Sequence, residues 1–157
     1  MRYWLMKSEP EVFSFEDLLK APKQTTHWEG VRNYQARNLM RDEFKAGDGV
    51  LFYHSNADVT GIAGVAEVVK EGYPDSAAED PKSDYYDPIT KKKPNPWVLV
   101  DVRATQRLQQ TVTRDMLKAD PAFKNMMVLK KGARLSVQPV TKEEFQRVLK
   151  IGGAQKL

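Results

Sequence analysis

Apolar and polar residues alternate along residues 96–108, and this period of two, together with many β-branched residues, is typical of a half-buried β-strand. We also predict strands at residues 2–7, 50–55, 61–69 and 134–140, of which the first is an aromatic and apolar stretch. The stretches at 50–55 and 61–69 are joined by the polar sequence NADVTG, so they should form a hairpin. Gly61 and Gly64 would weaken an ordinary strand, and they indicate a sharp bend or the close approach of another group.

Four other segments carry signals of helices: residues 13–19, 33–44, 113–129 and 141–150. Ser14 with Asp17, and Thr141 with Glu144, have the spacing of capping boxes, which start the first and the last of these helices. The third segment should form one or two short helices, because Pro121 interrupts it.

The second helix has a cap and a buried side that can be read from the sequence. Asn33 is suited to the cap, and Leu39, Met40 and Phe44 would provide the buried side. Gly47 is suited to ending this helix.

The order of these elements predicts an α+β fold. No strand–helix–strand repetition is present, which argues against a doubly wound parallel sheet. We expect a twisted, partly closed β-barrel with flanking helices, formed by one domain over residues 1–157, and a monomer or weak dimer. A single barrel core should draw on Val50, Phe52, Ile62, Val65, Val68, Leu99, Val102, Leu135 and Val137.

Two segments are expected to be loops. Residues 21–26 contain a proline, and residues 71–96 are polar and contain five prolines. A loop as long as the second is more often functional or mobile than idle. Its composition suggests that it buries little, so we expect it to become ordered through contacts made on ligand binding.

Composition narrows the function classes. The chain has 157 residues, of which 41% are hydrophobic and 29% charged, as in globular proteins. It contains no cysteine, which excludes disulfides, thiol catalysis and zinc sites built on cysteine. The start, MRYWLMKSEP, reads as a strand rather than a signal peptide, and no apolar stretch approaches the ~20 residues of a membrane span. The net charge of +4 leans only slightly toward polyanions.

Signals for catalysis and for bound ions are weak. The only histidines are His27 and His54, and His54 cannot pair with Ser55 because neighbouring strand residues point to opposite faces. A lone strand histidine is more often structural. The aspartates of DPKSDYYDP lack the spacing and glycine of a calcium loop, and no glycine-rich phosphate loop exists. We expect no catalytic residues, no metal and no cofactor.

Aromatic, amide and basic side chains are concentrated in HWEGVRNYQARN, residues 27–38. Rings that stack, amides that read base edges and guanidinium groups that meet phosphates are the parts of a nucleobase pocket. Similar groups elsewhere are Tyr53, Ser55, Asn56, Tyr85, Tyr86, Arg134, Gln138 and the lysines 91–93. Trp28 could equally plug one end of the barrel, and the lysines could form a solvated surface. The residues alone leave both interpretations open.

Several long blocks of the sequence resemble the EVE domain family. They are YWLMKSEP, FSFEDL, WEGVRNYQARNLMRD, GDGVLFYHSN, GIAGVAEV, YPDSAAEDPKSDYYDP and RLSVQPVTKEEF, in this order over nearly the whole chain. The resemblance implies a PUA-like fold, a β pseudo-barrel with flanking helices related to the YTH and ASCH domains. It also implies a pocket for a modified nucleobase, either flipped from DNA or presented by RNA.

The same resemblance assigns candidate ligand-binding residues. They are Lys7, Ser8, Trp28, Val31, Arg32, Asn33, Tyr53, His54, Ser55, Asn56, Arg134 and Gln138, together with Asp80, Tyr85 and Tyr86 in a lid formed by DPKSDYYDP.

The expected function is therefore non-catalytic binding of DNA or RNA that carries a modified base. The expected location is the cytoplasm, or the nucleus in a eukaryote, with no membrane partner. Two alternatives stay open: an enzyme acting on a modified nucleotide or RNA, and a protein-interaction module.

Overall fold

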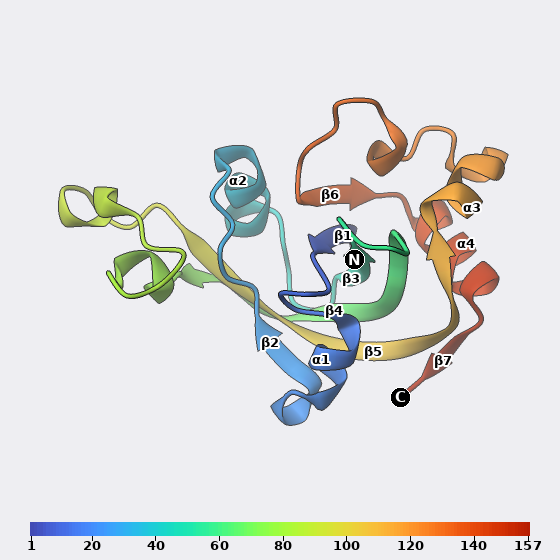
Figure 1. The fold of residues 1–157 in the computed structure, drawn as a ribbon, viewed down its shortest axis with the longest axis horizontal. Helices are drawn as coiled ribbons and strands as arrows, with labels where there is room; N and C mark the ends of the chain where they lie inside the picture. Colours follow the sequence, from blue (N-terminus) through green and yellow to red (C-terminus); the bar gives the residue numbers. More distant parts are fainter.

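A single mixed sheet of seven strands organises the fold in the computed structural model, which describes residues 1–157. The strands run in the order β2-β5-β4-β3-β1-β6, and β7 also pairs with β5. β1 and β3 are parallel, whereas all other pairs are antiparallel. Figure 1 shows the long strands β4 and β5 bending around β1 and β3. The bounds are β1 (Tyr3–Ser8), β2 (Thr25–His27), β3 (Gly49–His54), β4 (Gly61–Pro74), β5 (Val98–Thr113), β6 (Val137–Val140) and β7 (Ala154–Lys156).

Four α-helices flank the sheet, and each begins at a side-chain cap. Both predicted capping boxes are present, at Ser14 and at Thr141, and Asn33 accepts from the backbone N–H of Ala36 at 3.0 Å. These caps satisfy N–H groups that have no partner inside the helix. The helices are α1 (Phe15–Lys20), α2 (Tyr34–Asp42), α3 (Arg114–Ala119) and α4 (Lys142–Gly152).

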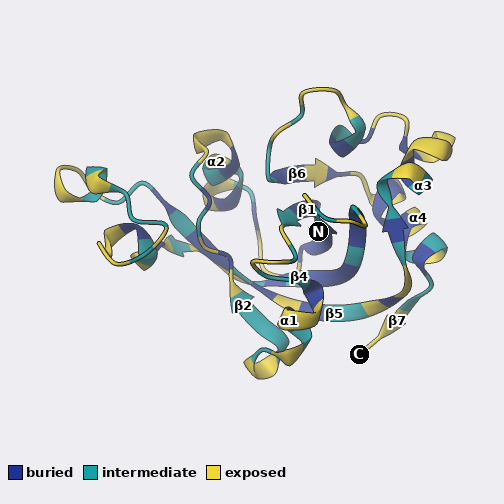
Figure 2. Cartoon of the chain, viewed as in Figure 1, coloured by how far each residue is buried: buried dark blue, intermediate teal, exposed yellow.

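The core has two parts, one on each face of the sheet, and the prediction of a single barrel core is wrong. In β1, Trp4 and Met6 belong to one cluster of 17 buried residues, whereas Leu5 between them belongs to a second cluster of 14. Phe52 and its neighbour Tyr53 are divided in the same way. Helices cover both faces, so β3 is buried except at its last residue and β1 is buried at Trp4, Leu5 and Met6 (Figure 2).

Most of the expected core residues are buried as predicted. Only Leu135 among the nine is partly exposed, and it packs against the first cluster. Gly61 and Gly64 in β4 also follow the prediction of close approach. A Cβ on Gly64 would lie 2.3 Å from the Phe15 ring, and one on Gly61 would lie 2.4 Å from the carbonyl oxygen of Val112.

Three local predictions are corrected by the structure. Thr25 and Thr26, expected in a loop, form β2 together with His27 by pairing with β5, and β7 was not foreseen. Both strands are three residues long, too short for an alternating pattern to be recognised. Gly47 does not end α2, which stops at Asp42. Its φ of +96° instead serves the turn before β3.

The two clusters should unfold together, because neighbouring residues of the same central strands supply both. Leu18→Ala in the first cluster and Leu117→Ala in the second each remove a fully buried side chain. Each substitution should cost about 2–5 kcal/mol of the free energy of unfolding. In calorimetry, both should shift the same single transition. Two transitions, of which each variant shifts only one, would contradict this.

Candidate functional site

Trp28 lies where the chain leaves β2 and crosses the sheet. Its backbone N–H donates to the carbonyl of Val100 at 2.8 Å, which continues the β2–β5 ladder by one residue. The indole meets the Phe52 ring edge-on, with centroids 5.4 Å apart, and Trp28 is only 8% exposed. Trp28 is therefore fixed by the core, and one edge of it reaches the surface.

That edge lines a hollow of about 590 Å³, here called the aromatic pocket. Its ring-bearing walls are Phe13, Trp28 and Tyr85, and Val12 and Val31 add apolar surface. The predicted residues Lys7, Ser8 and Arg32 also line it.

The indole N–H of Trp28 is a free hydrogen-bond donor. The indoles of Trp4 and Trp97 donate to Asp48 at 2.9 Å and to Asp87 at 2.7 Å, whereas Trp28 has no partner within the protein. No buried side-chain polar atom lacks a partner, so the Trp28 Nε1 must have accessible surface. Trp28 therefore brings to the aromatic pocket an indole that is held by the core and whose N–H is not used inside the protein.

A buried ion pair closes one side of this pocket. The carboxylate of Asp75 is fully buried and accepts from Arg32 Nη1 at 3.0 Å, from the N–H of Gly30 at 3.3 Å and from the N–H of Ala77 at 2.9 Å. Arg32 also donates to the carbonyl oxygen of Tyr85 at 2.7 and 3.1 Å. We call this set of contacts the Asp75–Arg32 clasp.

The clasp changes the role expected of Arg32. Its nitrogens donate to Asp75, Tyr85 and Val31, so the guanidinium is occupied within the protein rather than free for phosphate. Its carbon atom Cζ also lies 5.4 Å from the Trp97 ring centroid and 5.9 Å from that of Tyr85. Arg32 therefore positions the pocket wall.

Gly30 lets Tyr85 come close to the pocket floor. Gly30 has a φ of +83°, and a Cβ at this position would lie 2.6 Å from the Tyr85 ring. Only glycine fits both constraints without displacement.

The segment expected to form a lid is more ordered than its composition suggested. Asp75 and Ala78 are fully buried, and the backbone N–H of Asp87 donates to the carbonyl of Ala78 at 2.9 Å. Two 3-10 helices, η2 (Ser76–Glu79) and η3 (Pro88–Lys91), pack together at the far end of β4 and β5 (Figure 1). The expectation that this segment buries little is confirmed, since only Asp75 and Ala78 of residues 71–96 are buried, but its own polar groups cap its turns.

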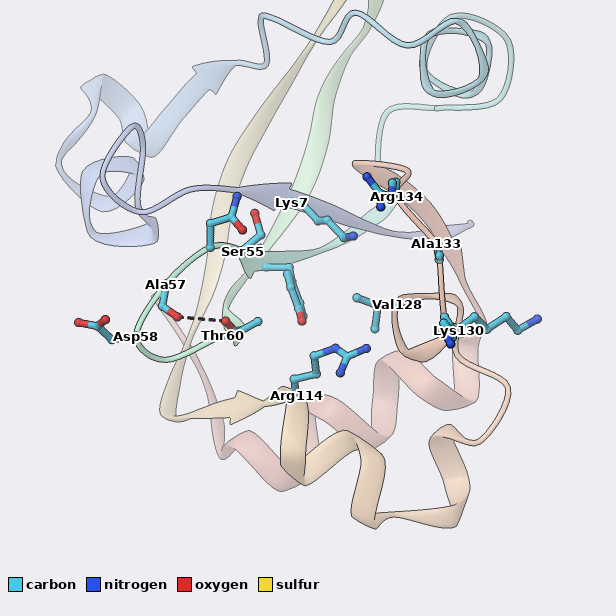
Figure 3. A pocket seen from close by; sticks show the side chains of 14 residues that line it. Lys7, Ser55, Ala57, Asp58, Thr60, Arg114, Val128, Lys130, Ala133 and Arg134 are labelled. Atoms are coloured by element: carbon cyan, nitrogen blue, oxygen red, sulfur yellow. Dashed lines mark hydrogen bonds between the residues drawn. The ribbon is translucent and has the colours of Figure 1, made fainter.

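A second hollow, of about 720 Å³, lies beside the first and shares Lys7 with it. We call it the basic pocket. The predicted residues Tyr53, Ser55, Asn56 and Arg134 line it, and it also contains cationic residues that the sequence did not single out: Arg114, Lys130 and Lys131. Figure 3 shows Lys7, Arg114 and Arg134 arriving from three separate segments.

Burial and like charge shift the protonation equilibria in the basic pocket. Burial lowers the pKa of Lys7 below its ordinary value, and the nearby Arg114 guanidinium lowers it further. Burial also raises the pKa of Tyr53, although Arg114 opposes this effect, so Tyr53 stays a neutral hydroxyl.

The fifteen predicted residues thus divide between two pockets, and several lie in neither. His54 Nε2 accepts from the N–H of Phe15 at 3.1 Å, and the Gln138 amide donates to Leu135 at 2.8 Å, both as structural bonds. Asn33 is occupied as the cap of α2. Asp80 and Tyr86 lie outside both linings, so of the lid only Tyr85 reaches the aromatic pocket. No group of three or more metal-ligating side chains lies together.

The sequence profile of the EVE domain matches residues 2–151. The chain belongs to the EVE domain family. Thymocyte nuclear protein 1 of Gallus gallus is 46% identical over 166 residues, which cover 95% of this chain and 68% of the relative. The Homo sapiens protein of the same name is 42% identical, with 95% and 73% covered.

Solved structures of relatives agree with the fold described above. A hypothetical protein from Leishmania major superposes with a TM-score of 0.90 at 44% identity, covering 98% of this chain and 95% of that one. Human THYN1 protein in complex with DNA containing 5-methylcytosine superposes with a TM-score of 0.89 at 43% identity, covering 97% and 98%. An ASCH protein of Zymomonas mobilis shares the fold alone, at 10% identity and a TM-score of 0.56 over 96% and 99% of the two chains. The expected PUA-like EVE fold is confirmed. No helix is both long and apolar enough to cross a membrane.

Substitution of Gly30 tests the contact with Tyr85. Gly30→Ala should push the Tyr85 ring away and loosen residues 75–90, because the new Cβ would meet the ring at 2.6 Å. Gly132→Ala is a matched control, since Gly132 has a similar φ of +78° but nothing within 4 Å of a built Cβ. Amide hydrogen exchange in residues 75–90 should accelerate in the first variant only. Equal exchange in both would contradict the contact.

His54 should make stability depend on pH. Burial lowers its pKa below the ordinary value, against a smaller opposing effect of Asp17, so the folded state favours neutral imidazole. The unfolded chain takes up this proton near pH 6.5, and stability should therefore fall as the pH drops through about 6.5 toward the folded pKa. His54→Gln keeps an acceptor for Phe15 and removes the titration. Denaturant unfolding at pH 7.5 and 5.5 should show a smaller loss in the variant, and an equal loss would contradict the assignment.

Proposed function

We propose that this chain binds nucleic acid carrying a modified base, that the base enters the aromatic pocket, and that no bond is made or broken there. The single observation that carries the proposal is the free indole N–H of Trp28, held by the core at the edge of an aromatic hollow. A flat heterocycle with acceptor atoms on its edge complements such a site, because it can stack on a ring and accept from the indole.

The walls of the pocket suit a base rather than a long apolar chain. Phe13 and Tyr85 supply partly exposed rings, and base–aromatic stacking contributes about 1–3 kcal/mol per base. Lys7, Ser8 and Ser136 also line the pocket, and polar groups of this kind can fix the orientation of a bound base.

The relative crystallised with DNA containing 5-methylcytosine makes this base the first ligand to test. Burying one methyl group contributes roughly 0.8 kcal/mol, which corresponds to about fourfold in affinity. We therefore expect a modest preference for the methylated strand, with most of the affinity common to both strands.

The tyrosine pair at 85 and 86 offers a matched test of the pocket. Tyr85→Ala should weaken binding of an oligonucleotide with one 5-methylcytosine by about 1–3 kcal/mol, because a stacking wall is lost. Tyr86→Ala removes the same side chain from a residue outside the pocket lining and should leave binding unchanged. Fluorescence anisotropy measures both, and melting curves verify that both variants are folded.

Three outcomes distinguish this function from its competitors. Equal binding by the Tyr85→Ala and parent proteins would contradict the pocket assignment. Mass spectrometry of the recovered oligonucleotide would reveal an enzyme as a change of mass. Absence of binding to methylated and unmethylated DNA and RNA alike would contradict nucleic-acid recognition and leave protein interaction as the remaining class.

A further inference from the structure

The basic pocket contains positively charged residues to which the proposed function assigns no role. Lys7, Arg114, Lys130, Lys131 and Arg134 line it, and Asp58 is the only carboxylate among its lining residues. None of the five cationic side chains forms an ion pair with a carboxylate. Five positive groups around one hollow repel one another, so the arrangement favours an anionic ligand.

The basic pocket differs from the rest of the molecule in that its arginine side chains lack carboxylate and carbonyl partners. Seven of the nine arginine side chains bind a carboxylate or a backbone carbonyl of the protein: those of Arg2, Arg32, Arg37, Arg41, Arg103, Arg107 and Arg147. The remaining two, Arg114 and Arg134, both line the basic pocket. The guanidinium groups left without an acidic or carbonyl partner are therefore collected in one place.

Neutral hydrogen-bonding groups complete the lining. Tyr53, Ser55 and Thr60 bring hydroxyl groups from β3 and the turn after it. Lys7 stands beside Tyr53 because β1 and β3 pair in parallel at these positions. Partial burial of the Lys7 ammonium group and the nearby Arg114 both lower the pKa of Lys7. Desolvated cations with nearby hydroxyls suit a phosphate, whose oxygens accept from both.

The two pockets lie close enough to serve one strand. Lys7 lines both, and its backbone N–H donates to the carbonyl of Ser136 at 2.8 Å. Ser136 lines the aromatic pocket, whereas Arg134, two residues earlier, lines the basic pocket. The step of two residues from Arg134 to Ser136 spans at most about 7 Å. Two nucleotides along one strand rise by roughly the same distance.

We infer that the basic pocket binds a backbone phosphate of the same strand, within about two nucleotides of the base held in the aromatic pocket. This inference rests on the proposed function for the ligand, but Arg114 and Arg134, which carry it, do not line the aromatic pocket. Lys7 lies at the boundary between the phosphate and the base. Arg114 and Arg134 supply the charge that meets the phosphate.

The test compares a ligand with phosphates and one without. Arg114→Gln and Arg134→Gln should each weaken binding of an oligonucleotide with one 5-methylcytosine. Each should also lower the slope of log affinity against log salt by roughly 0.7 for a single strand. Binding of 5-methyl-2′-deoxycytidine, which lacks phosphate, should be unchanged when followed by nuclear magnetic resonance titration. Arg107→Gln is the matched control, because it removes one positive charge from an exposed pair with Glu16.

The possible outcomes separate the two claims. A parental salt slope in both pocket variants, with the preference for the methylated strand retained, would overturn the phosphate site alone. Reduced slopes without any preference for methylation would support the phosphate site and contradict base recognition. A slope lowered equally by Arg107→Gln would overturn the site as well, because it would show only a general charge effect. Absence of oligonucleotide binding would overturn both claims.

Discussion

The Asp75–Arg32 clasp is the interaction on which the candidate site depends. A fully buried carboxylate is costly unless charge and hydrogen bonds compensate it, and Asp75 receives both from Arg32, Gly30 and Ala77. These donors lie on two segments that are distant in sequence, residues 28–33 and the long connection between β4 and β5. The clasp therefore brings Tyr85 into the same pocket lining as Trp28. Removing Arg32 would leave the buried Asp75 carboxylate without a cation. A substitution at Arg32 would therefore change the local stability as well as the shape of the aromatic pocket.

The sheet supplies the rigid side of the site. Its central strands are buried on both faces, and alternate residues enter two separate clusters. One cluster holds Trp28 against Phe52, while the other contains Tyr53, which lines the basic pocket. Adjacent residues of β3 thus support the two pockets in different ways: Phe52 packs beneath Trp28, and Tyr53 lines the basic pocket directly. A core divided in this way lets one short strand support an aromatic surface and a charged surface at once.

Local signals in the sequence were sufficient to predict most of the helices and strands. They were not sufficient to predict which residues the fold brings together in each pocket. Capping boxes and alternation predicted the helices and the long strands, because they depend on neighbours along the chain. Arg32 was expected to meet phosphate, and no local pattern shows that its partners Asp75 and Tyr85 lie 43 and 53 residues away. Arg114 was missed for the same reason, since at the start of a predicted helix it resembles any surface arginine. The resemblance to the EVE domain named residues of both pockets without separating them.

The tryptophan indole signals provide the most direct test of the account. The protein has three tryptophans, and in ¹H–¹⁵N spectra each gives one indole N–H resonance. Titration with 5-methyl-2′-deoxycytidine should shift the Trp28 signal, because its N–H is free and the Trp28 side chain lines the aromatic pocket. The Trp4 and Trp97 signals should stay in place, because their N–H groups are bound to Asp48 and Asp87. Saturable binding that leaves the Trp28 signal unmoved would contradict the placement of the base in this pocket.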